Sequence, residues 1–413
     1  MSAYLIESLA GSSTPTIRKK INIKISSNLG HLNLGAVKVK ILFWTTTFFI
    51  IYTYILYPVG IWALSRRKPS TETTDPIIIS EWPNITVIVA VYNEQHRIIN
   101  KIRNLQALDY DQDKLHILFV SDGSNDATNK LLTHEPKVEL LSYSQRRGKP
   151  YALNLALQKI SSEIIVFTDV RQELTPYSLR YLVASLSQPN IGAVSGELVH
   201  WSTNNCIAEH IGLYWRYEKW IRKSESRFAS TIGATGALYA IHRADYSPLA
   251  EDTLLDDFEI PLQIIRQGKR VLLDSRAIIY DELQKDATGE RKRKIRTLTG
   301  NFQAFTRNTW LFSPQKNPIF LQFISHKVFR LLVPYAMLLL LVSSFFTSGL
   351  FYKITLAAQL LFYLLSFMGF LLPYLKKYRL ISFATVFIEL NAAAVLALFN
   401  YLTGQVDPRW EKT

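Results

Sequence analysis

The sequence predicts an α/β fold with a mostly parallel sheet, joined to several membrane helices. Three β-branched, apolar runs of strand length end abruptly in polar residues, at 85–94, 119–124 and 164–169. Buried parallel strands have this pattern, and open α/β sheets bind ligands at the carboxyl ends of their strands. Each run carries a carboxylate at or near its end, which indicates a nucleotide-binding site at that edge of the sheet.

The composition favours a membrane protein. The chain has 413 residues, a net charge of +14 and 48% hydrophobic residues, enough for one large domain with additional elements or for two domains. Basic runs at 66–68, 146–149 and 291–296 suit nucleic acid, an anionic membrane surface or phosphate-bearing substrates. Long apolar stretches beside some of these runs favour the membrane and argue against nucleic acid. The single cysteine, Cys206, excludes an intramolecular disulfide and a multi-cysteine zinc site.

The N-terminal part divides into a tail, a span and a linker. Residues 1–40 form a polar, basic tail without the features of a signal peptide. Residues 41–64 are nearly all apolar or aromatic, which predicts a transmembrane helix because roughly 20 such residues cross a bilayer. A mostly polar linker covers 71–82. Residues 83–310 then alternate strand-like and helix-like patterns, as parallel α/β domains do.

The C-terminal part, 329–402, contains three further apolar segments that are long enough to span. They lie at about 329–350, 354–375 and 380–402, and a short tail follows at 403–413. Before them, residues 311–328 mix aromatic and basic side chains around two prolines. We expect this segment to lie in the membrane interface; an amphipathic connector packed on the α/β domain is the alternative.

The basic loop at 376–379 predicts the topology, since such loops are usually cytoplasmic. Counting the spans back from this loop places the domain at 83–310 in the cytoplasm, at the plasma (inner) membrane, and the tail at 1–40 on the other side. The basic residues of that tail conflict with this position. Either the first segment does not span, or the charge of the tail is overridden.

Candidate nucleotide-binding residues follow the second run. Asp122 precedes Gly123, which permits a tight turn, and its carboxylate is suited to accept hydrogen bonds from a base or ribose. Lys149 opens a predicted helix whose first-turn N–H groups and cations suit phosphate. Each signal alone is weak, because Asp-Gly turns and solvated basic turns are common.

Three further carboxylates are candidates for catalysis or metal binding. Asp169 ends the third run, and a carboxylate there suits ribose or a divalent ion bridging a pyrophosphate. Asp256 and Asp257 are adjacent and lie beside apolar residues. Carboxylates in such a pair can raise one another's pKa, which suits a general base. The alternative is a pair of acids that stabilise the start of a helix.

Together these residues resemble the family 2 glycosyltransferases, particularly the membrane-embedded synthases of poly-N-acetylglucosamine, hyaluronan, chitin and cellulose. The resemblance covers about 83–303 and the predicted spans, and it implies a GT-A-type nucleotide-sugar-binding domain. Its specificity lies in the order and spacing of seven motifs rather than in any one of them. The motifs are Ala90-Val91-Tyr92-Asn93-Glu94, Ser121-Asp122-Gly123-Ser124, Gly148-Lys149, Thr168-Asp169-Val170-Arg171, Gly233-Ala234-Thr235-Gly236-Ala237, Asp256-Asp257 and Arg293-Lys294-Ile295-Arg296-Thr297.

The resemblance implies a role for each matched position. Asp257, at the last position of the family's Thr-Glu-Asp, would be the general base for a single inverting displacement, with Asp256 beside it. Asp169 begins the family's Asp-x-Asp and would hold Mg²⁺ or Mn²⁺. The turn with Gly233, Thr235 and Gly236 would pass close to donor and acceptor. The nucleotide-sugar would be bound by Tyr92, Glu94, Asp122, Lys149, Asp169, Arg171, Arg293 and Arg296, the last of which would neutralise the departing diphosphate.

Three departures from the family pattern matter. Asp-x-Asp has become Asp169-Val170-Arg171, and we hypothesise that Arg171 supplies positive charge in place of a metal. Gln-x-x-Arg-Trp ends here in Thr297, which lacks the tryptophan that stacks on the acceptor sugar and leaves processive growth open. Thr-Glu-Asp has become Leu255-Asp256-Asp257, a milder change.

The expected function is a membrane-bound, inverting transfer of sugar from a UDP-sugar to a growing exopolysaccharide or cell-envelope glycan. One alternative is the addition of a single sugar to a lipid-linked acceptor. Another is a catalytically degenerate partner subunit of a polysaccharide synthase. The expected partners are the nucleotide-sugar, the glycan or lipid-linked acceptor, the bilayer, and accessory synthase or export subunits.

Overall fold

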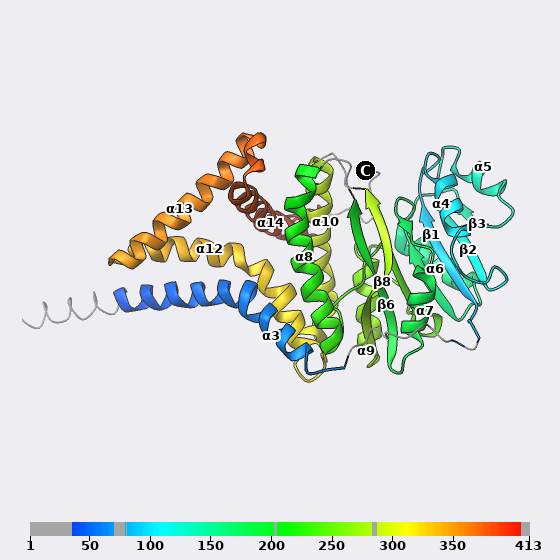
Figure 1. Ribbon diagram of the computed structural model, residues 1–413, viewed down its shortest axis with the longest axis horizontal. Helices are drawn as coiled ribbons and strands as arrows, with labels where there is room; N and C mark the ends of the chain where they lie inside the picture. The colour runs from blue at the N-terminus through cyan, green and yellow to red at the C-terminus, as the bar shows by residue number, and fades with distance from the viewer. Residues whose placement is uncertain (1–34, 70–78, 80, 202–204, 283–286, 406–413) are drawn as a thin grey trace, which may run out of the picture.

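The computed structural model describes residues 35–69, 79, 81–201, 205–282 and 287–405 (Figure 1). Most of the predicted N-terminal tail and linker and the end of the C-terminal tail lie outside these residues. For Cys206 the structure describes the helical backbone and not the side chain. In Figure 1 the α/β domain occupies one end of the molecule and a group of long helices the other. Helices α8 (Asn205–Phe228) and α10 (Ala287–Arg307) stand between them.

Eight strands form one sheet in the order β3-β2-β1-β4-β7-β6-β8-β5. The pairings β1–β2, β1–β4, β2–β3 and β6–β8 are parallel, whereas β7 and β5 run antiparallel to their neighbours. The sheet is therefore mostly parallel, as predicted. The strands are β1 (Ile85–Val91), β2 (Leu115–Asp122), β3 (Glu139–Tyr143), β4 (Ile164–Thr168), β5 (Glu173–Leu174), β6 (Ile191–Trp201), β7 (Leu238–His242) and β8 (Arg270–Glu282).

The central strands are apolar because helices cover both faces of the sheet. Successive side chains of β1 point to opposite faces, so Val87 joins one core cluster and Ile88 the other. The first cluster includes side chains of α4 (Ile98–Gln106) and α7 (Ser178–Leu186), and the second those of α6 (Lys149–Lys159) and α9 (Asp256–Arg266). A short helix, α5 (Thr128–Thr133), lies beside β3.

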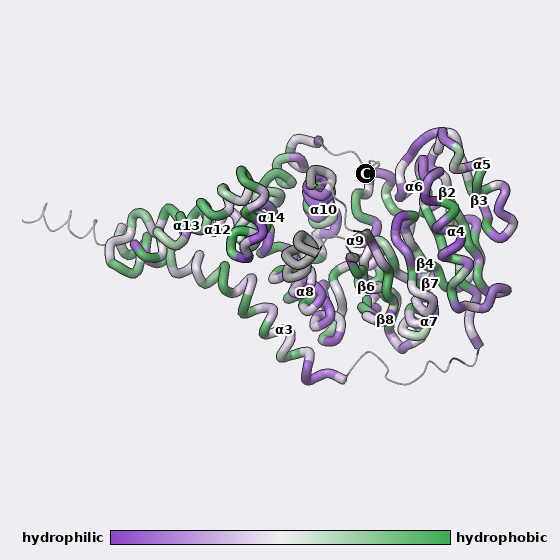
Figure 2. Tube along the Cα trace, turned by 45° about the horizontal axis from the view of Figure 1, so that its top comes forward, coloured by the Kyte–Doolittle hydropathy of each residue, from purple (hydrophilic) through white to green (hydrophobic). Residues whose placement is uncertain are grey.

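Four helices are long and apolar enough to cross a membrane: Gly35–Ser65, Phe320–Phe346, Leu350–Leu371 and Arg379–Leu402. Figure 2 shows them as the most hydrophobic part of the chain. The first includes η1 (Tyr52–Leu56) and α3 (Tyr57–Ser65), and the second includes α11 (Phe320–Gln322), η4 (Phe323–Val328) and α12 (Phe329–Phe346). The last two are α13 and α14. The chain also has three short 3-10 helices among the described residues, η2 (Arg243–Asp245), η3 (Thr309–Phe312) and η5 (Pro373–Lys377).

The segment expected at the membrane interface, 311–328, ends inside the second of these helices. Leu311, Ile319 and Phe323 are buried in the same core cluster as α9, and the rings of Phe305 and Phe323 meet edge to face at 4.9 Å. These side chains pack on the α/β domain, as the alternative described. An interfacial position for the rest of the segment stays a prediction.

Lys101 of α4 is a buried cation that ties this helix to the end of β4. Its ammonium donates to Thr168 Oγ1 at 3.1 Å and to the Gln172 carbonyl at 2.8 Å, so it brackets the segment that carries Asp169. Burial lowers the pKa of Lys101 to about 7, although Asp169 and Glu173 oppose the shift. The folded protein therefore loses this proton at a lower pH than the unfolded chain does.

Replacing Lys101 with methionine should change how stability depends on pH. Between pH 7 and 10 the unfolded wild-type chain keeps a proton that the folded protein has released, so wild-type stability rises by up to ~1.4 kcal/mol per pH unit from this group. Lys101→Met lacks this contribution. We therefore expect the unfolding free energy of the wild type, minus that of the variant, to increase with pH. Denaturant unfolding in detergent measures both values. Lys130→Met, at an exposed site, is the control, and a difference that does not vary with pH would contradict the assignment.

Candidate active site

The loops after β1 and β2 are fastened to each other. The Asn93 N–H donates to Ser124 Oγ at 3.0 Å, and the Asn93 side-chain oxygen accepts from the Asn125 N–H at 2.9 Å. The Glu94 N–H donates to Thr128 Oγ1 at 2.8 Å. Asn93 adopts a positive φ of 54°, which asparagine tolerates better than most residues. These contacts place the first two predicted motifs at one edge of the sheet.

Asp122 is fully buried and holds the loop that precedes α6. Its carboxylate accepts from the N–H groups of Arg147 at 2.6 Å and Gly148 at 2.9 Å, and from the Tyr143 hydroxyl at 2.9 Å. Gly148 has a φ of 97°, a conformation that favours glycine. In this structure Asp122 therefore acts on the site through the shape of the loop. Direct contact with a base or ribose stays a prediction.

Tyr92 and Arg146 form one wall of the candidate site. The Arg146 guanidinium lies 4.0 Å from the centre of the Tyr92 ring. Glu94 is close by and pairs with Arg97 at 3.3 Å, with its side chain largely buried. An aromatic face, a cation and a carboxylate in one place are suited to bind a nucleoside.

Lys149 connects two of the predicted carboxylates. Its ammonium lies 3.1 Å from Asp169 Oδ1, after β4, and 3.2 Å from Asp256 Oδ2, at the start of α9. Burial works against the charge, yet Asp169, Asp256 and Asp257 together raise the pKa of Lys149 above its usual value. The lysine therefore stays protonated and offers a fixed positive charge where a phosphate would bind.

Asp257 is the carboxylate whose environment best suits a general base. Burial and the neighbouring Asp256 raise its pKa to about 6, whereas Lys149 and Lys327 favour the charged form. The alternative interpretation of the acidic pair also applies, because α9 begins at Asp256 and the two acids lie in its first turn. The role of Asp257 as a general base stays a prediction. The buried Tyr239 also contacts the pair, since its hydroxyl donates to Asp256 at 3.3 Å.

The turn at 233–237 packs directly against Asp257. The Ala234 N–H donates to the Asp257 carbonyl at 2.8 Å. A Cβ atom at Gly236 would lie 2.7 Å from Asp257 Oδ2, and one at Gly233 would lie 2.9 Å from the Phe258 ring. Only glycine permits this approach, so the turn and the carboxylate form one unit.

Two of the predicted arginines contact carboxylates other than Asp169 and Asp256. Arg171 pairs with Asp281 at 2.5 Å, near the end of β8, and Gln172 donates to the same carboxylate at 3.2 Å. Arg293 of α10 contacts Glu290 at 3.1 Å. Burial, together with the nearby charge of Arg171, lowers the pKa of Arg293, so these two arginines share one neighbourhood. Their role in donor binding, and that of Arg296, stays a prediction.

Sequence reasoning did not identify Asp281 and Lys101. Asp281 lies near the end of a strand, like the carboxylates that were identified, and this position could have indicated it. Lys101 gives no local signal, because a single lysine on an amphipathic helix is ordinarily solvated.

The residues at Asp169 suit a metal only with a substrate present. Among the described residues, no three His, Cys, Asp or Glu side chains are grouped as metal ligands would be. Asp169 is half-exposed and offers a single carboxylate, in contact with Lys149. Mg²⁺ binds in this manner when water and substrate phosphates complete its shell. The protein alone does not provide a complete metal site.

Comparisons with known proteins find similar sequences. Residues 86–244 match the model of glycosyl transferase family 2. Poly-β-1,6-N-acetyl-D-glucosamine synthase of Staphylococcus aureus is 22% identical over 252 residues, which cover 59% of this chain and 60% of the relative. A probable glycosyltransferase of Sulfolobus acidocaldarius is 27% identical over 241 residues, 54% of this chain and 49% of the relative. The chain thus spans about 60% or less of the length of these curated relatives.

A solved structure has the same fold over most of the chain. It is a mannosyltransferase of Pyrobaculum calidifontis in complex with GDP-Man and Mn²⁺, with a TM-score of 0.68 and 22% identity. The match covers 89% of this chain and 99% of that one. The predicted GT-A-type fold with membrane helices is confirmed by this similarity and by the four apolar helices.

Adding a methyl group at Gly236 should impair the site without unfolding the protein. The new Cβ atom in Gly236→Ala would displace the Asp257 carboxylate, which lies at the end of a short side chain and is able to rotate. We expect a loss of activity of about 100-fold, as misplacing a reacting group does, and little change in thermal stability. Gly60→Ala, where nothing lies within 4 Å of the added atom, is the control. Equal activity in both variants would contradict this geometry.

Proposed function

We propose that this chain, whose residues 86–244 match the model of glycosyl transferase family 2, is a membrane-bound inverting glycosyltransferase. It transfers a sugar from a nucleotide-sugar to a growing exopolysaccharide or cell-envelope glycan, and the donor we favour is a UDP-sugar. The observation that carries the proposal is the group formed by Asp257, Asp256, Asp169 and Lys149 beside the glycine turn at 233–237. A buried base and a fixed cation lie there within one site.

Asp257 acts as the general base. With a pKa of about 6 it is largely deprotonated at neutral pH and still basic enough to accept a proton. It removes the proton from the acceptor hydroxyl, whose oxygen attacks the anomeric carbon of the donor. The nucleoside diphosphate leaves from the opposite side, so a single displacement inverts the configuration. The residues that bind the nucleotide-sugar are those at the family motifs given above.

Positive charge balances the leaving diphosphate. Lys149 is the nearest cation to the carboxylates, and Arg293 and Arg296 are the family's candidates on α10. Arg171 is paired with Asp281, so donor binding would have to share or release that contact. A divalent ion at Asp169 would add Lewis-acid stabilisation of the diphosphate; its remaining ligands would come from the donor and water.

The acceptor has two candidates. The Staphylococcus relative is named for a polymer of N-acetylglucosamine, which supports a growing glycan. Thr297 in place of the family's tryptophan favours a single addition to a lipid-linked acceptor. The length of the product separates the two, since a polymer supports the first and one added sugar the second.

The four apolar helices support a location in a membrane. We place the catalytic domain on the cytoplasmic side of the plasma (inner) membrane, where nucleotide-sugars are available and where the basic loop at 376–379 is expected. Accessory synthase or export subunits would complete a secretion system. A degenerate partner subunit is the remaining alternative, and the presence of both Asp257 and Arg296 argues against it.

Removing the proposed base should abolish transfer. In Asp257→Asn we expect release of nucleoside diphosphate to fall by at least about 1,000-fold, tested with detergent-solubilised protein and a panel of UDP- and GDP-sugars. In the wild type the rate should decline as pH falls through about 6, because protonated Asp257 accepts no proton. Asp113→Asn, at an exposed site, is the control. Full activity in Asp257→Asn with the preferred donor would overturn the assignment.

The missing second aspartate predicts weak dependence on metal. If positive side chains replace the ion, treatment with EDTA should leave most of the nucleoside diphosphate release intact, and added Mn²⁺ should raise it by less than about 3-fold. The Arg171→Asp variant recreates the family's Asp-x-Asp and should respond more strongly to Mn²⁺. Activity that EDTA abolishes and Mg²⁺ or Mn²⁺ restores in the wild type would show that an ion is required.

A further inference from the structure

Helix α8 presents a cation to the turn that contacts Asp257. The Arg222 guanidinium donates to Thr235 Oγ1 at 3.1 Å, to Ser195 Oγ at 3.4 Å and to the Gly233 carbonyl at 3.5 Å. The Thr235 N–H donates to the same Ser195 Oγ at 2.8 Å. Two of the three Arg222 bonds end on the turn at 233–237 and the third ends on Ser195 of β6, so Arg222 links the turn to α8 and to β6.

No carboxylate of the described residues forms an ion pair with Arg222. Burial lowers the pKa of Arg222, and Glu218, Glu225, Asp257 and Glu197 oppose that shift from a distance. A half-buried guanidinium that bonds to neutral oxygens is costly to place. Such a cost is usual at functional sites, where geometry matters more than stability.

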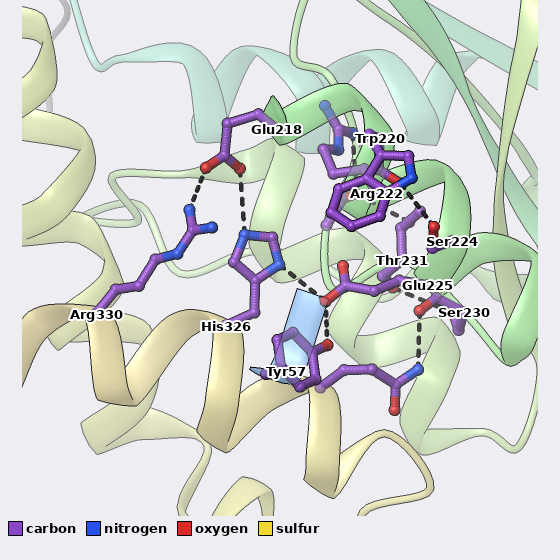
Figure 3. A network of polar contacts seen from close by, with 12 residues as sticks. Tyr57, Glu218, Trp220, Arg222, Ser224, Glu225, Ser230, Thr231, His326 and Arg330 are labelled. Atoms are coloured by element: carbon purple, nitrogen blue, oxygen red, sulfur yellow. Dashed lines mark hydrogen bonds and ion pairs between the residues drawn. The ribbon is translucent and has the colours of Figure 1, made fainter. Parts of the chain in front are cut away.

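Helix α8 is itself fixed to two membrane helices (Figure 3). Glu218 forms an ion pair with Arg330 and lies 3.2 Å from His326 Nε2. Glu225 lies 2.8 Å from His326 Nδ1 and accepts from the Tyr57 hydroxyl at 2.5 Å. His326 and Arg330 belong to the second apolar helix, and Tyr57 to the first.

The spacing of these residues along α8 explains the arrangement. Glu218, Arg222 and Glu225 are separated by four and three positions, which places them on one face of a helix. Figure 3 shows Glu218 and Glu225 turned toward His326, Arg330 and Tyr57 of the two apolar helices. Arg222 thus lies between two carboxylates that are each anchored to the spans, and its position relative to them is set by the helix.

We propose that Arg222 is a positioning residue for the transfer reaction. From a helix anchored to the membrane spans, it holds the turn at 233–237 against Asp257 and keeps the base aligned with the acceptor. The inference rests on the proposed function, in which Asp257 is the base. It adds a residue on α8 that lies outside the seven family motifs.

Arg222 also influences the charge of Asp257. The groups that face this carboxylate are Asp256 on its own helix, Tyr239 of β7, Asp169 after β4, Lys149 of α6, Lys327 of the second apolar helix and Arg222 of α8. Among them Lys149, Lys327 and Arg222 are cations and favour the charged form. Removing Arg222 should therefore raise the pKa of Asp257 further and move the acid side of the pH–rate profile to higher pH.

The test compares Arg222→Gln, Arg222→Lys and, as a matched control on the same helix, Arg227→Gln. Arg227 is also an arginine, but its guanidinium donates to the Lys68 carbonyl, away from the turn. In Arg222→Gln we expect kcat to fall by about 100-fold, while the KM for the donor stays within about 3-fold of the wild-type value. The acid side of the pH–rate profile should move to higher pH, and hydrogen exchange of the backbone amides at 233–237 should accelerate. Arg222→Lys should keep the pH profile but recover kcat only in part, since lysine lacks the planar fork.

An unchanged pH profile together with unchanged exchange at 233–237 in Arg222→Gln would overturn the inference. If the wild type transfers no sugar from any donor, the proposed function has failed, and exchange at 233–237 alone then decides whether Arg222 holds the turn. If Arg222→Gln does not fold, Thr235→Val removes one acceptor of the guanidinium and leaves its charge. That variant should lower kcat and accelerate exchange while the pH profile stays in place; no change in either kcat or exchange would also overturn the inference.

Discussion

The contact on which the candidate site depends is the ammonium of Lys149 between Asp169 and Asp256. The two carboxylates come from segments almost ninety positions apart, and together with Asp257 they would repel one another in the absence of a cation. Lys149 reduces this repulsion while Asp257 stays buried enough to keep a raised pKa. The same lysine thus permits three acids to share one site and supplies charge for a phosphate.

The close approach of backbone to Asp257 is the second constraint. Gly233 and Gly236 leave no room for a side chain, and the Ala234 N–H is bonded to the Asp257 carbonyl. The turn and the first turn of α9 therefore move together. Since Arg222 holds the other side of the turn, the proposed base is fixed from the sheet, from α9 and from α8.

Helix α8 connects the candidate site to the apolar helices. Glu218 and Glu225 bind residues of two apolar helices, so the domain and the spans are joined by buried polar contacts as well as by apolar packing. Buried ionic contacts contribute less to stability than to a defined arrangement. An acceptor that approaches from the membrane would therefore meet a catalytic turn at a fixed place.

The sequence by itself determined the strands, the parallel sheet and the four apolar helices, because hydrophobic periodicity and length are local properties of the chain. It also predicted that the carboxylates after β1, β2 and β4 lie at one edge of the sheet, since adjacent parallel strands bring their carboxyl ends together. Only the tertiary structure decided how the polar groups are paired. Arg171 contacts Asp281, Asp122 is enclosed by its own loop, and Arg222 reaches the glycine turn. Such pairings depend on contacts between residues distant in sequence, and no local pattern encodes them.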